Sequence, residues 1–383
     1  MLAIEMRRSP QQIHPDQSWL FGSEQDREIT VGRLPQSAVL IEEPTVSGHH
    51  LTLRRQEAGW LLLHHGRNPT YVDGSAVHQV QVTSGMVAQL TYTGPFLTFR
   101  VLPSCRHEGN PPRGFFCHQC GQPLRVLKQI RSYQVLKVLG RGGMGTTYEV
   151  WQAGQVRVLK EMNAEMLRHA KAQELFEREA RTLQRLCHPG VPRFYDFFVE
   201  QGTPYLLMEM IYGQDLESLV GRRGRIGFTE ARSWMVQLCE ILEYLHHLEP
   251  PVIHRDVKPA NILVRHSDQR VVLLDFGAVK EVGTPAGTCI GSPSFCPPEQ
   301  NMGKPVVASD LYAIAPTLCY LLTGLDPSVY LQDRGQGVRL YMDQIPGVPT
   351  SLGAVIAQIS APRPVDRPPS ARAIAQMLLQ VNS

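Results

Sequence analysis

The chain has 383 residues, which is enough for two or three domains at about 100–200 residues each. Hydrophobic residues make up 43% and charged residues 19%, so a mostly disordered or fibrous protein is excluded. The net charge of +3 comes from 38 Lys and Arg against 35 Asp and Glu. This balance does not favour nucleic acid as a partner, and we expect none.

No stretch reaches the roughly 18 uninterrupted apolar residues that a membrane-spanning helix needs. The first residues also lack the apolar core of a secretory signal. We therefore expect a soluble, cytoplasmic protein without a transmembrane segment. The 8 cysteines are unevenly spaced, and in such a chain a disulfide framework is not expected.

Residues 19–102 are predicted to form an all-β sandwich, preceded by an N-terminal extension over residues 1–18. Short runs of β-branched and apolar residues alternate here with turn residues such as Gly32 and Asn68. The predicted strands are Glu28–Val31, Leu51–Arg54, Trp60–Leu63, Thr70–Val72, Val80–Val82 and Phe96–Val101. Strands this short and this frequent are typical of a sandwich.

Residues 103–127 are rich in proline and glycine and hold three of the 8 cysteines, which indicates a linker or a very small module. Cys117 and Cys120 form a CxxC turn, and Cys105 and His107 lie upstream of it. Four such ligands make a candidate tetrahedral zinc site. Because the upstream half is not a CxxC, reduced thiols in a linker remain the alternative.

Residues 128–383 are predicted to form a two-lobed α+β domain. Strand-like runs at 134–139, 146–152 and 155–160 come first, and long helical periods follow. In the first of these, Phe176, Ala180 and Leu183 recur at helical spacing.

Three clusters in this last region have chemical meaning. Gly140-Arg141-Gly142-Gly143-Met144-Gly145 is a glycine-rich turn in which backbone N–H groups can approach phosphate oxygens. Lys160 ends the strand at 155–160, and Glu179 lies 19 residues later on the first helix. His254-Arg255-Asp256-Val257-Lys258-Pro259-Ala260-Asn261 and Asp275-Phe276-Gly277 follow in that order.

Taken together, these clusters make residues 133–383 resemble a complete protein kinase domain. The sequences GRGGMG, HRDVKPAN and PPEQ at 297–300 are similar to those of the eukaryotic-like serine/threonine kinases of bacteria. Lys258, two residues after Asp256, is typical of serine/threonine rather than tyrosine kinases.

The resemblance implies transfer of the γ-phosphoryl group of ATP to Ser or Thr hydroxyls of proteins, with Mg²⁺ or Mn²⁺. The implied catalytic residues are Asp256, Lys258, Lys160 and Glu179, and the implied metal ligands are Asn261 and Asp275. The implied ATP-binding residues are Gly140, Gly142, Gly145, Val158, Lys160, Met208, Glu209, Met210, Ile211 and Leu263. In the lower lobe, it implies that Glu299 pairs with Arg367 and that Asp310 anchors the catalytic loop.

Arg255 places a cation next to Asp256, where it can receive a phosphate from the activation segment. We expect autophosphorylation at Thr284 or Thr288 to order that segment, with transient self-association for transfer between copies. Thr147 and Val158 depart from the kinase pattern, which has Val and Ala there. The rival hypothesis is therefore a catalytically weak kinase-fold scaffold that binds phosphopeptides.

The turns of the predicted sandwich bring together a cation, a hydroxyl and an amide, at Arg33, Ser47 and Asn68. This set suits a phosphorylated side chain, which carries about −1.5 to −2 charge and three acceptor oxygens. By the spacing of these residues the segment resembles a forkhead-associated (FHA) domain.

The FHA resemblance implies phosphothreonine recognition. Arg33 and Ser47 would contact the phosphate, Asn68 would hold the peptide, Thr70 completes the implied set, and His50 braces the loop. Gly48 and Pro69 depart from the family pattern, so a sandwich used only for packing is the alternative. A reader of this kind would recruit a partner, a second copy or the kinase loop itself by raising the effective concentration.

Overall fold

The structure is a computed structural model that describes most of the chain. The described residues are 1–9, 12, 15–21, 26–57, 59–101, 109–111, 114–143, 145–281, 292–335, 337–342, 345 and 348–381. Backbone contacts divide the chain into two units. The first comprises Met1–Arg141 and Thr147–Leu159, and the second Gly142–Thr146 and Lys160–Ser383.

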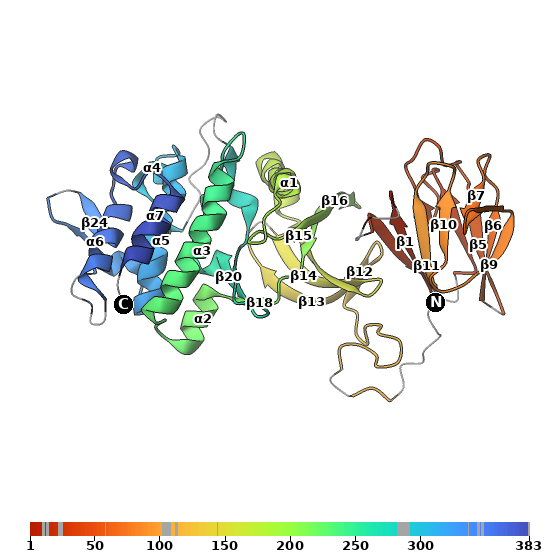
Figure 1. Cartoon of the computed structure of the whole chain (residues 1–383), viewed down its shortest axis with the longest axis horizontal. Coiled ribbons are helices and arrows are strands. Elements are labelled where there is room, and N and C mark those ends of the chain that lie inside the picture. The colour runs from red at the N-terminus through yellow and green to blue at the C-terminus, as the bar shows by residue number, and fades with distance from the viewer. Residues whose placement is uncertain are drawn as a thin grey trace. The chain divides into compact units, whose positions relative to one another are not determined.

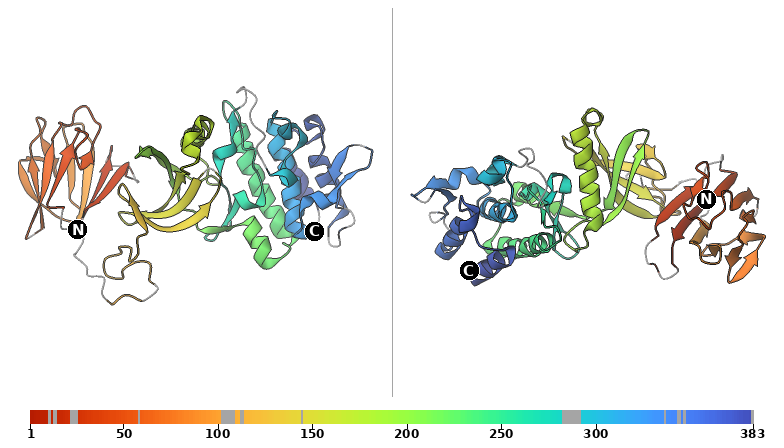
Figure 2. Two further views of the ribbon diagram at one scale, coloured as in Figure 1. Left: turned by 180° about the vertical axis from the view of Figure 1, so that it is seen from behind. Right: turned by 90° about the horizontal axis from the view of Figure 1, so that it is seen from above.

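The first unit contains a β-sandwich, drawn in red and orange in Figure 1 and seen from two further sides in Figure 2. One sheet has the strand order β2-β1-β11-β10-β7-β8 and the other β4-β3-β5-β6-β9. Strands β3 and β4 pair in parallel, whereas β3, β5, β6 and β9 pair antiparallel. The strands are β1 (Leu2–Arg7), β2 (Gln17–Phe21), β3 (Glu28–Gly32), β4 (Val39–Leu40), β5 (Leu51–Gln56), β6 (Gly59–His64), β7 (Thr70–Val72), β8 (Ser75–Val77), β9 (Gln79–Val82), β10 (Val87–Leu90) and β11 (Phe96–Val101).

The sandwich core follows the two-residue period of its strands. In β6, Trp60 and Leu62 are buried in the core while Leu61 and Leu63 are only half-buried. Each of the strands predicted from the sequence is present, with ends shifted by at most a few residues.

The predicted extension over residues 1–18 is wrong, because its residues enter the sandwich. Strand β1 pairs with β11 on one side, Leu2 opposite Val101, and with β2 on the other. Leu2 and Ile4 are fully buried in the sandwich core. Burial of this apolar face fixes the first residues of the chain as a strand.

A further six-stranded sheet has the strand order β12-β13-β14-β15-β17-β16. Strands β14 and β15 each have residues in both units. The bounds are β12 (Lys128–Ile130), β13 (Tyr133–Arg141), β14 (Gly145–Gln152), β15 (Gln155–Met162), β16 (Phe194–Glu200) and β17 (Thr203–Glu209). The three strands predicted from the sequence correspond to β13, β14 and β15.

The second unit is mainly helical after α1 (Ala170–Arg185), which follows the short helix η1 (Met166–Arg168). Helix α5 is apolar and buried nearly all round, and α3 packs against both α5 and α7. The other helices are α2 (Leu216–Arg223), α3 (Phe228–His246), α4 (Pro298–Asn301), α5 (Val307–Thr323), α6 (Thr350–Ile359) and α7 (Ala371–Gln380).

Short elements complete this unit. The strands are β18 (Gly213–Asp215), β19 (Val252–Ile253), β20 (Ile262–Arg265), β21 (Val271–Leu273), β22 (Lys280–Glu281), β23 (Leu331–Asp333) and β24 (Val338–Leu340). The 3-10 helices are η2 (Pro259–Asn261), η3 (Phe276–Ala278), η4 (Pro293–Phe295), η5 (Pro327–Tyr330) and η6 (Pro364–Asp366). Strands β18, β20 and β21 form a small sheet, in which β20 directly follows η2 and β21 ends two residues before Asp275.

Candidate active site

A buried ion-pair cluster joins β15, α1 and the start of η3. The Nζ atom of Lys160 lies 2.7 and 2.8 Å from the carboxylate oxygens of Glu179, and 3.2 Å from Oδ1 of Asp275. Glu179 is buried on the inner face of α1, one helical turn after Phe176 and next to Ala180. The structure thus brings together three residues that are up to 115 positions apart in the sequence.

The charges in this cluster stabilise one another. Burial acts to lower the pKa of Lys160, but the carboxylates of Glu179 and Asp275 outweigh it and raise that pKa above its ordinary value. The ammonium group of Lys160 in turn lowers the pKa of Asp275. A fixed ammonium group and a carboxylate at neutral pH are suited to contact a phosphate and a divalent cation, respectively.

The predicted catalytic loop forms a second compact group. Lys258 Nζ lies 2.9 Å from Oδ2 of Asp256 and donates to the hydroxyl of Ser292 at 3.0 Å. Asn261 Nδ2 donates to the backbone carbonyl of Asp256 at 2.9 Å and to its Oδ2 at 2.8 Å. An ammonium group and an amide are therefore both held within hydrogen-bond reach of the same carboxylate.

The ligand chemistry of Asn261 and Asp275 fits Mg²⁺. Both Asp256 atoms that Asn261 contacts are acceptors, so the amide nitrogen faces Asp256 and Oδ1 points away from it. That amide oxygen and the carboxylate of Asp275 are hard oxygen donors, which Mg²⁺ prefers, with substrate phosphates as further ligands. In the part of the chain that the structure describes, no group of three or more His, Cys, Asp or Glu could hold a metal ion.

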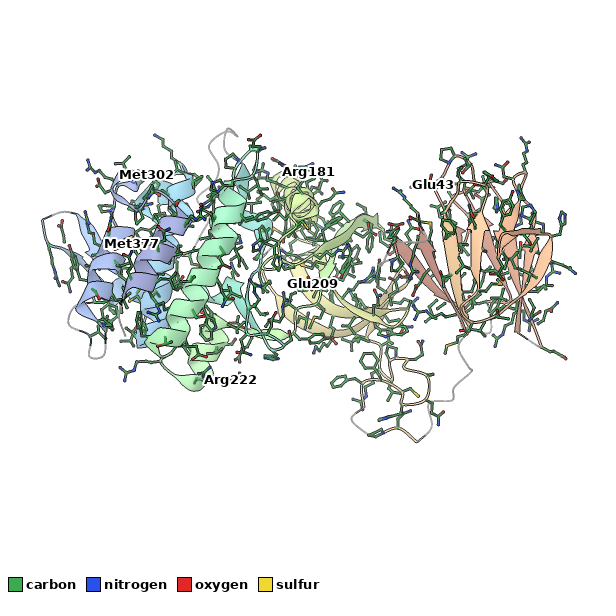
Figure 3. All side chains as sticks on the ribbon, in the orientation of Figure 1. Glu43, Arg181, Glu209, Arg222, Met302 and Met377 are labelled. Atoms are coloured by element: carbon green, nitrogen blue, oxygen red, sulfur yellow. The ribbon has the colours of Figure 1, made fainter. Side chains whose placement is uncertain are left out.

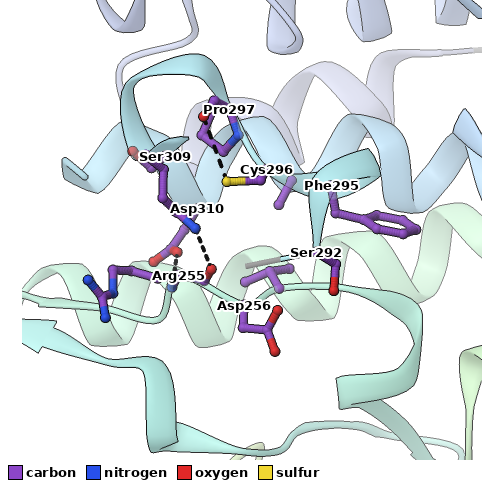
Figure 4. A pocket seen from close by; sticks show the side chains of 11 residues that line it. Arg255, Asp256, Ser292, Phe295, Cys296, Pro297, Ser309 and Asp310 are labelled. Atoms are coloured by element: carbon purple, nitrogen blue, oxygen red, sulfur yellow. Dashed lines mark hydrogen bonds between the residues drawn. The ribbon is translucent and has the colours of Figure 1, made fainter. Parts of the chain in front are cut away.

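The catalytic loop is anchored from the long helix α5, as expected from the sequence. Asp310 is buried, and its carboxylate accepts from the backbone N–H groups of His254 and Arg255, both at 2.8 Å. His246 lies 2.9 Å from the same carboxylate, and these partners outweigh burial and lower the pKa of Asp310. Figure 4 shows Asp310 beside Arg255, in a small pocket that Asp256 and Ser292 also line.

The glycine-rich turn closes between β13 and β14. Gly142 N–H donates to the carbonyl of Gly145 at 2.9 Å. A Cβ atom on Gly145 would collide with the backbone carbonyl of Glu161 in the neighbouring strand. Glycine is therefore required at this position by close backbone approach, while Gly140 has open space around it.

The predicted adenine-binding residues lie on several elements. Met208 and Glu209 end β17, and Met210 and Ile211 follow it without regular secondary structure. Glu209, labelled in Figure 3, accepts from the backbone N–H of Arg193 at 3.1 Å through its side chain. Leu263 lies in β20, opposite Asp215 and Val272, and Val158 is buried in β15.

Arg255 is buried, and its Nε atom donates to the carbonyl of Ala278. Burial and the nearby charge of Arg178 lower the pKa of Arg255. Arg178 lies on α1 and pairs with Glu174 at 2.6 Å. The expected phosphorylation sites Thr284 and Thr288 lie outside the described residues.

The ion pair predicted between Glu299 and Arg367 is present. Two guanidinium nitrogens of Arg367 lie 2.7 and 2.9 Å from the carboxylate oxygens of Glu299. Arg367 is fully buried and also donates to the carbonyls of Ala361, Pro362 and Ala308. This bidentate pair joins α4 to the segment that leads into α7.

In the sandwich, the predicted phosphopeptide residues lie on adjoining loops. Arg33 N–H donates to the carbonyl of Ser47 at 3.1 Å, and Arg33 Nε donates to that of Val46. The Ser47 hydroxyl accepts from Arg67 N–H at 2.9 Å, and Asn68 Nδ2 donates to the carbonyl of Thr45 at 2.8 Å. Arg33, Ser47 and Asn68 thus belong to one hydrogen-bonded group of loops.

Thr70 does not share this exposed position. Its side chain is fully buried in β7, and its hydroxyl lies 3.0 Å from Nδ1 of His64. His50 is also fully buried and accepts from Ser47 N–H at 3.2 Å, which matches the bracing role expected of it. We therefore leave Thr70 out of the proposed contact set.

The connector contains a tight turn between the two predicted cysteine ligands. Cys117 N–H donates to the carbonyl of Gln122, and Gly121 N–H donates to that of Cys117 at 2.8 Å. Cys105 and His107 lie outside the described residues. A zinc-binding module is therefore not supported.

Comparison with known protein families identifies the family of the larger part of the chain. Residues 133–383 match the family described as protein kinase domain. The chain belongs to the protein kinase family. Residues 29–90 match the FHA domain, so this kinase-family chain also carries a forkhead-associated domain. Both matches agree with the resemblances seen in the sequence.

Bacterial serine/threonine kinases are among its relatives. Serine/threonine-protein kinase B of Synechocystis sp. is 38% identical over 253 residues, which are 60% of this chain and 43% of that protein. Serine/threonine-protein kinase PknA of Nostoc sp. is 33% identical over 264 residues, 64% of this chain and 46% of that protein. The chain spans about half the length of the curated relatives it matches.

Among solved structures, the kinase domain of PknI from Mycobacterium tuberculosis is similar, with 26% identity and a TM-score of 0.54. The match covers 67% of this chain and 99% of that chain. Within the described residues, no helix is both long and apolar enough to cross a membrane.

Proposed function

We propose that this protein is a serine/threonine protein kinase that uses ATP and Mg²⁺. The observation that carries the proposal is the buried cluster of Lys160, Glu179 and Asp275. In a kinase, the pairing of the lysine with the helix glutamate and the placement of the metal-binding aspartate must both be in place for turnover. The pairing of Lys160 with Glu179 and the contact between Lys160 and Asp275 support the proposal.

In the proposed step, the substrate hydroxyl oxygen attacks the γ-phosphorus of ATP. The bond from that phosphorus to the β–γ bridging oxygen breaks, ADP leaves, and the hydroxyl proton passes to the carboxylate of Asp256. Lys258 steadies the transferring group, and Lys160 holds the α- and β-phosphates. Mg²⁺ held by Asn261 and Asp275 would neutralise phosphate charge when bound.

The proposal is tested by identifying the amino acid that receives the phosphoryl group. The protein is incubated with labelled ATP, Mg²⁺ and a peptide library containing Ser, Thr and Tyr, beside an Asp256→Asn control. We expect label on Ser or Thr in the wild type alone. Nucleotide binding without any transfer would favour the rival, a kinase-fold scaffold, to which Thr147 and Val158 point.

We further propose that the FHA domain reads phosphothreonine through Arg33, Ser47 and Asn68. The support is that these side chains lie on loops joined to one another by hydrogen bonds. The reader would localise the kinase on a phosphorylated partner, a second copy or its own activation segment. Deletion of residues 1–101 is expected to slow phosphorylation of a native partner while leaving that of a short peptide unchanged.

Activation is proposed to follow phosphorylation of Thr284 or Thr288, with transfer between transiently associated copies. Arg255 and Arg178 supply adjacent positive charge, which favours capture of a phosphate. Mass spectrometry of ATP-treated protein is expected to find phosphate on one of these threonines. Finding neither modified would contradict the proposal.

The zinc site of the connector stays a prediction from the sequence. It needs Cys105 and His107 beside Cys117 and Cys120, as two pairs of ligands around one ion. Elemental analysis tests it, with one zinc per chain expected and its loss in Cys117→Ser. A chain free of zinc, when purified without chelator, would identify these residues as ordinary thiols.

A further inference from the structure

The tip of the glycine-rich loop is held by a side chain from the neighbouring strand end. Asn163, directly after β15, donates through Nδ2 to the carbonyl of Gly142 at 2.9 Å and to that of Gly143 at 3.2 Å. Its Oδ1 accepts from the Thr146 hydroxyl at 3.3 Å. One amide therefore contacts the loop on both sides of its turn.

The backbone of Asn163 is itself fixed. Its carbonyl accepts from the N–H groups of Met166 at 2.9 Å and Leu167 at 3.3 Å, where the chain enters η1. The side chain thus projects from an anchored residue, and the loop tip is tied to the segment that leads to α1, the helix that carries Glu179.

We propose that Asn163 is a positioning residue that holds the glycine-rich loop ready to bind the phosphates of ATP. In a trans peptide the carbonyl and the following N–H point in opposite directions. Because Asn163 draws the Gly142 carbonyl to its side, the N–H of Gly143 faces the other way. Backbone N–H groups presented in this manner are the groups with which such loops bind phosphate.

This inference rests on the proposed use of ATP and predicts a selective defect. The hydrogen bonds of Asn163 act on the part of the loop that covers phosphates and not on adenine. Asn163→Ala is expected to weaken ATP and ADP binding about five- to tenfold, in line with about 1 kcal/mol for a hydrogen bond. The affinity for adenosine, which has no phosphate, is expected to stay unchanged.

The test is calorimetric titration of the full chain with ATP, ADP and adenosine. Glu165→Ala is the matched control, because Glu165 lies two residues away and makes no capping hydrogen bond with its side chain. Asn163→Leu keeps a side chain of similar size and loses both donors without adding a charge near the phosphates, so it is expected to behave like Asn163→Ala. This second variant serves if the alanine variant does not fold.

Four outcomes are decisive. Weaker ATP binding with unchanged adenosine binding supports the inference. Equal ATP binding by Asn163→Ala and wild type overturns it, as does an equal loss for all three ligands, which would indicate a general structural role. A wild type that binds no ATP overturns the proposed function as well.

Discussion

At the scale of single residues, a buried group keeps its charge only where an oppositely charged partner lies beside it. Lys160 and Asp275 hold their charges in the site because each stabilises the other. His50 is the opposite case, since it is fully buried without a carboxylate partner and its Nε2 makes no hydrogen bond. Burial, together with the nearby His64, lowers the pKa of His50 from 6.5 to about 4.

The lowered pKa of His50 predicts an acid-sensitive sandwich. As the pH falls below 6.5, the unfolded chain binds a proton at this position and the folded chain does not. Stability is therefore complete above that pH and is lost progressively until the pH reaches about 4, by about 3 kcal/mol in all. Urea unfolding of the wild type and His50→Gln at pH 7 and pH 5 measures the difference.

We expect the free energy of unfolding of the wild type to fall more steeply between these pH values than that of His50→Gln. Other histidines, such as His64 and His65, titrate in both proteins, so the comparison isolates His50. Parallel losses in the two proteins would show that His50 does not stay neutral when folded.

At the scale of elements, the ion pair between Glu299 and Arg367 is expected to stabilise the helical lobe. Arg367→Met leaves the half-buried carboxylate of Glu299 without its cation, which typically costs about 3–5 kcal/mol. Arg363→Met is the matched control, because the pair of Arg363 with Asp366 lies at the surface and should matter little. Thermal unfolding of the two variants measures the difference. An equal loss of stability in Arg367→Met and Arg363→Met would contradict this expectation.

Some secondary-structure elements could be predicted from the sequence and others could not. Local patterns located the strands β3, β5, β6, β7, β9 and β11, because apolar runs between turn residues need no distant partner to be recognised. Strand β1 was missed because its burial depends on pairing with β11, at the other end of the domain. The hairpin of β23 and β24 was likewise unexpected, since its strands are only three residues each.

In the candidate site, too, some residues could be predicted from the sequence and others could not. Charged residues such as Lys160, Glu179 and Asp275 could be predicted because a known set of motifs fixes their order, and the structure brings them together. Asn163 could not, because two of its three partners are backbone carbonyls, which leave no mark in the sequence. The resemblance to FHA domains implies Thr70 as a contact residue, and only its burial shows that it faces inward.

At the scale of the whole molecule, we expect that phosphothreonine binding by the FHA domain can be lost without loss of phosphate transfer by the kinase domain. Arg33→Ala removes the cation of the proposed phosphate site but touches no residue of the kinase domain. We expect phosphothreonine peptide binding to weaken at least about tenfold, as for loss of a charge-assisted hydrogen bond. Phosphorylation of a short peptide should stay at the wild-type rate.

Fluorescence anisotropy with a phosphothreonine peptide and its unphosphorylated twin measures the binding side of this prediction. Arg55→Ala, elsewhere on the sandwich, serves as a control for general loss of positive charge. Equal affinity of wild type and Arg33→Ala for the phosphorylated peptide would contradict the reader function and favour a sandwich used for packing.

The rest of the proposed function depends on transfer of phosphate from ATP by this chain, which a labelling experiment tests. The full chain is incubated with radiolabelled ATP and Mg²⁺ beside Asp256→Asn, which keeps the size of the side chain but cannot accept the hydroxyl proton. We expect label on protein Ser or Thr in the wild type and none in the variant. Equal labelling of both proteins, or binding of ATP without labelling of either, would contradict it.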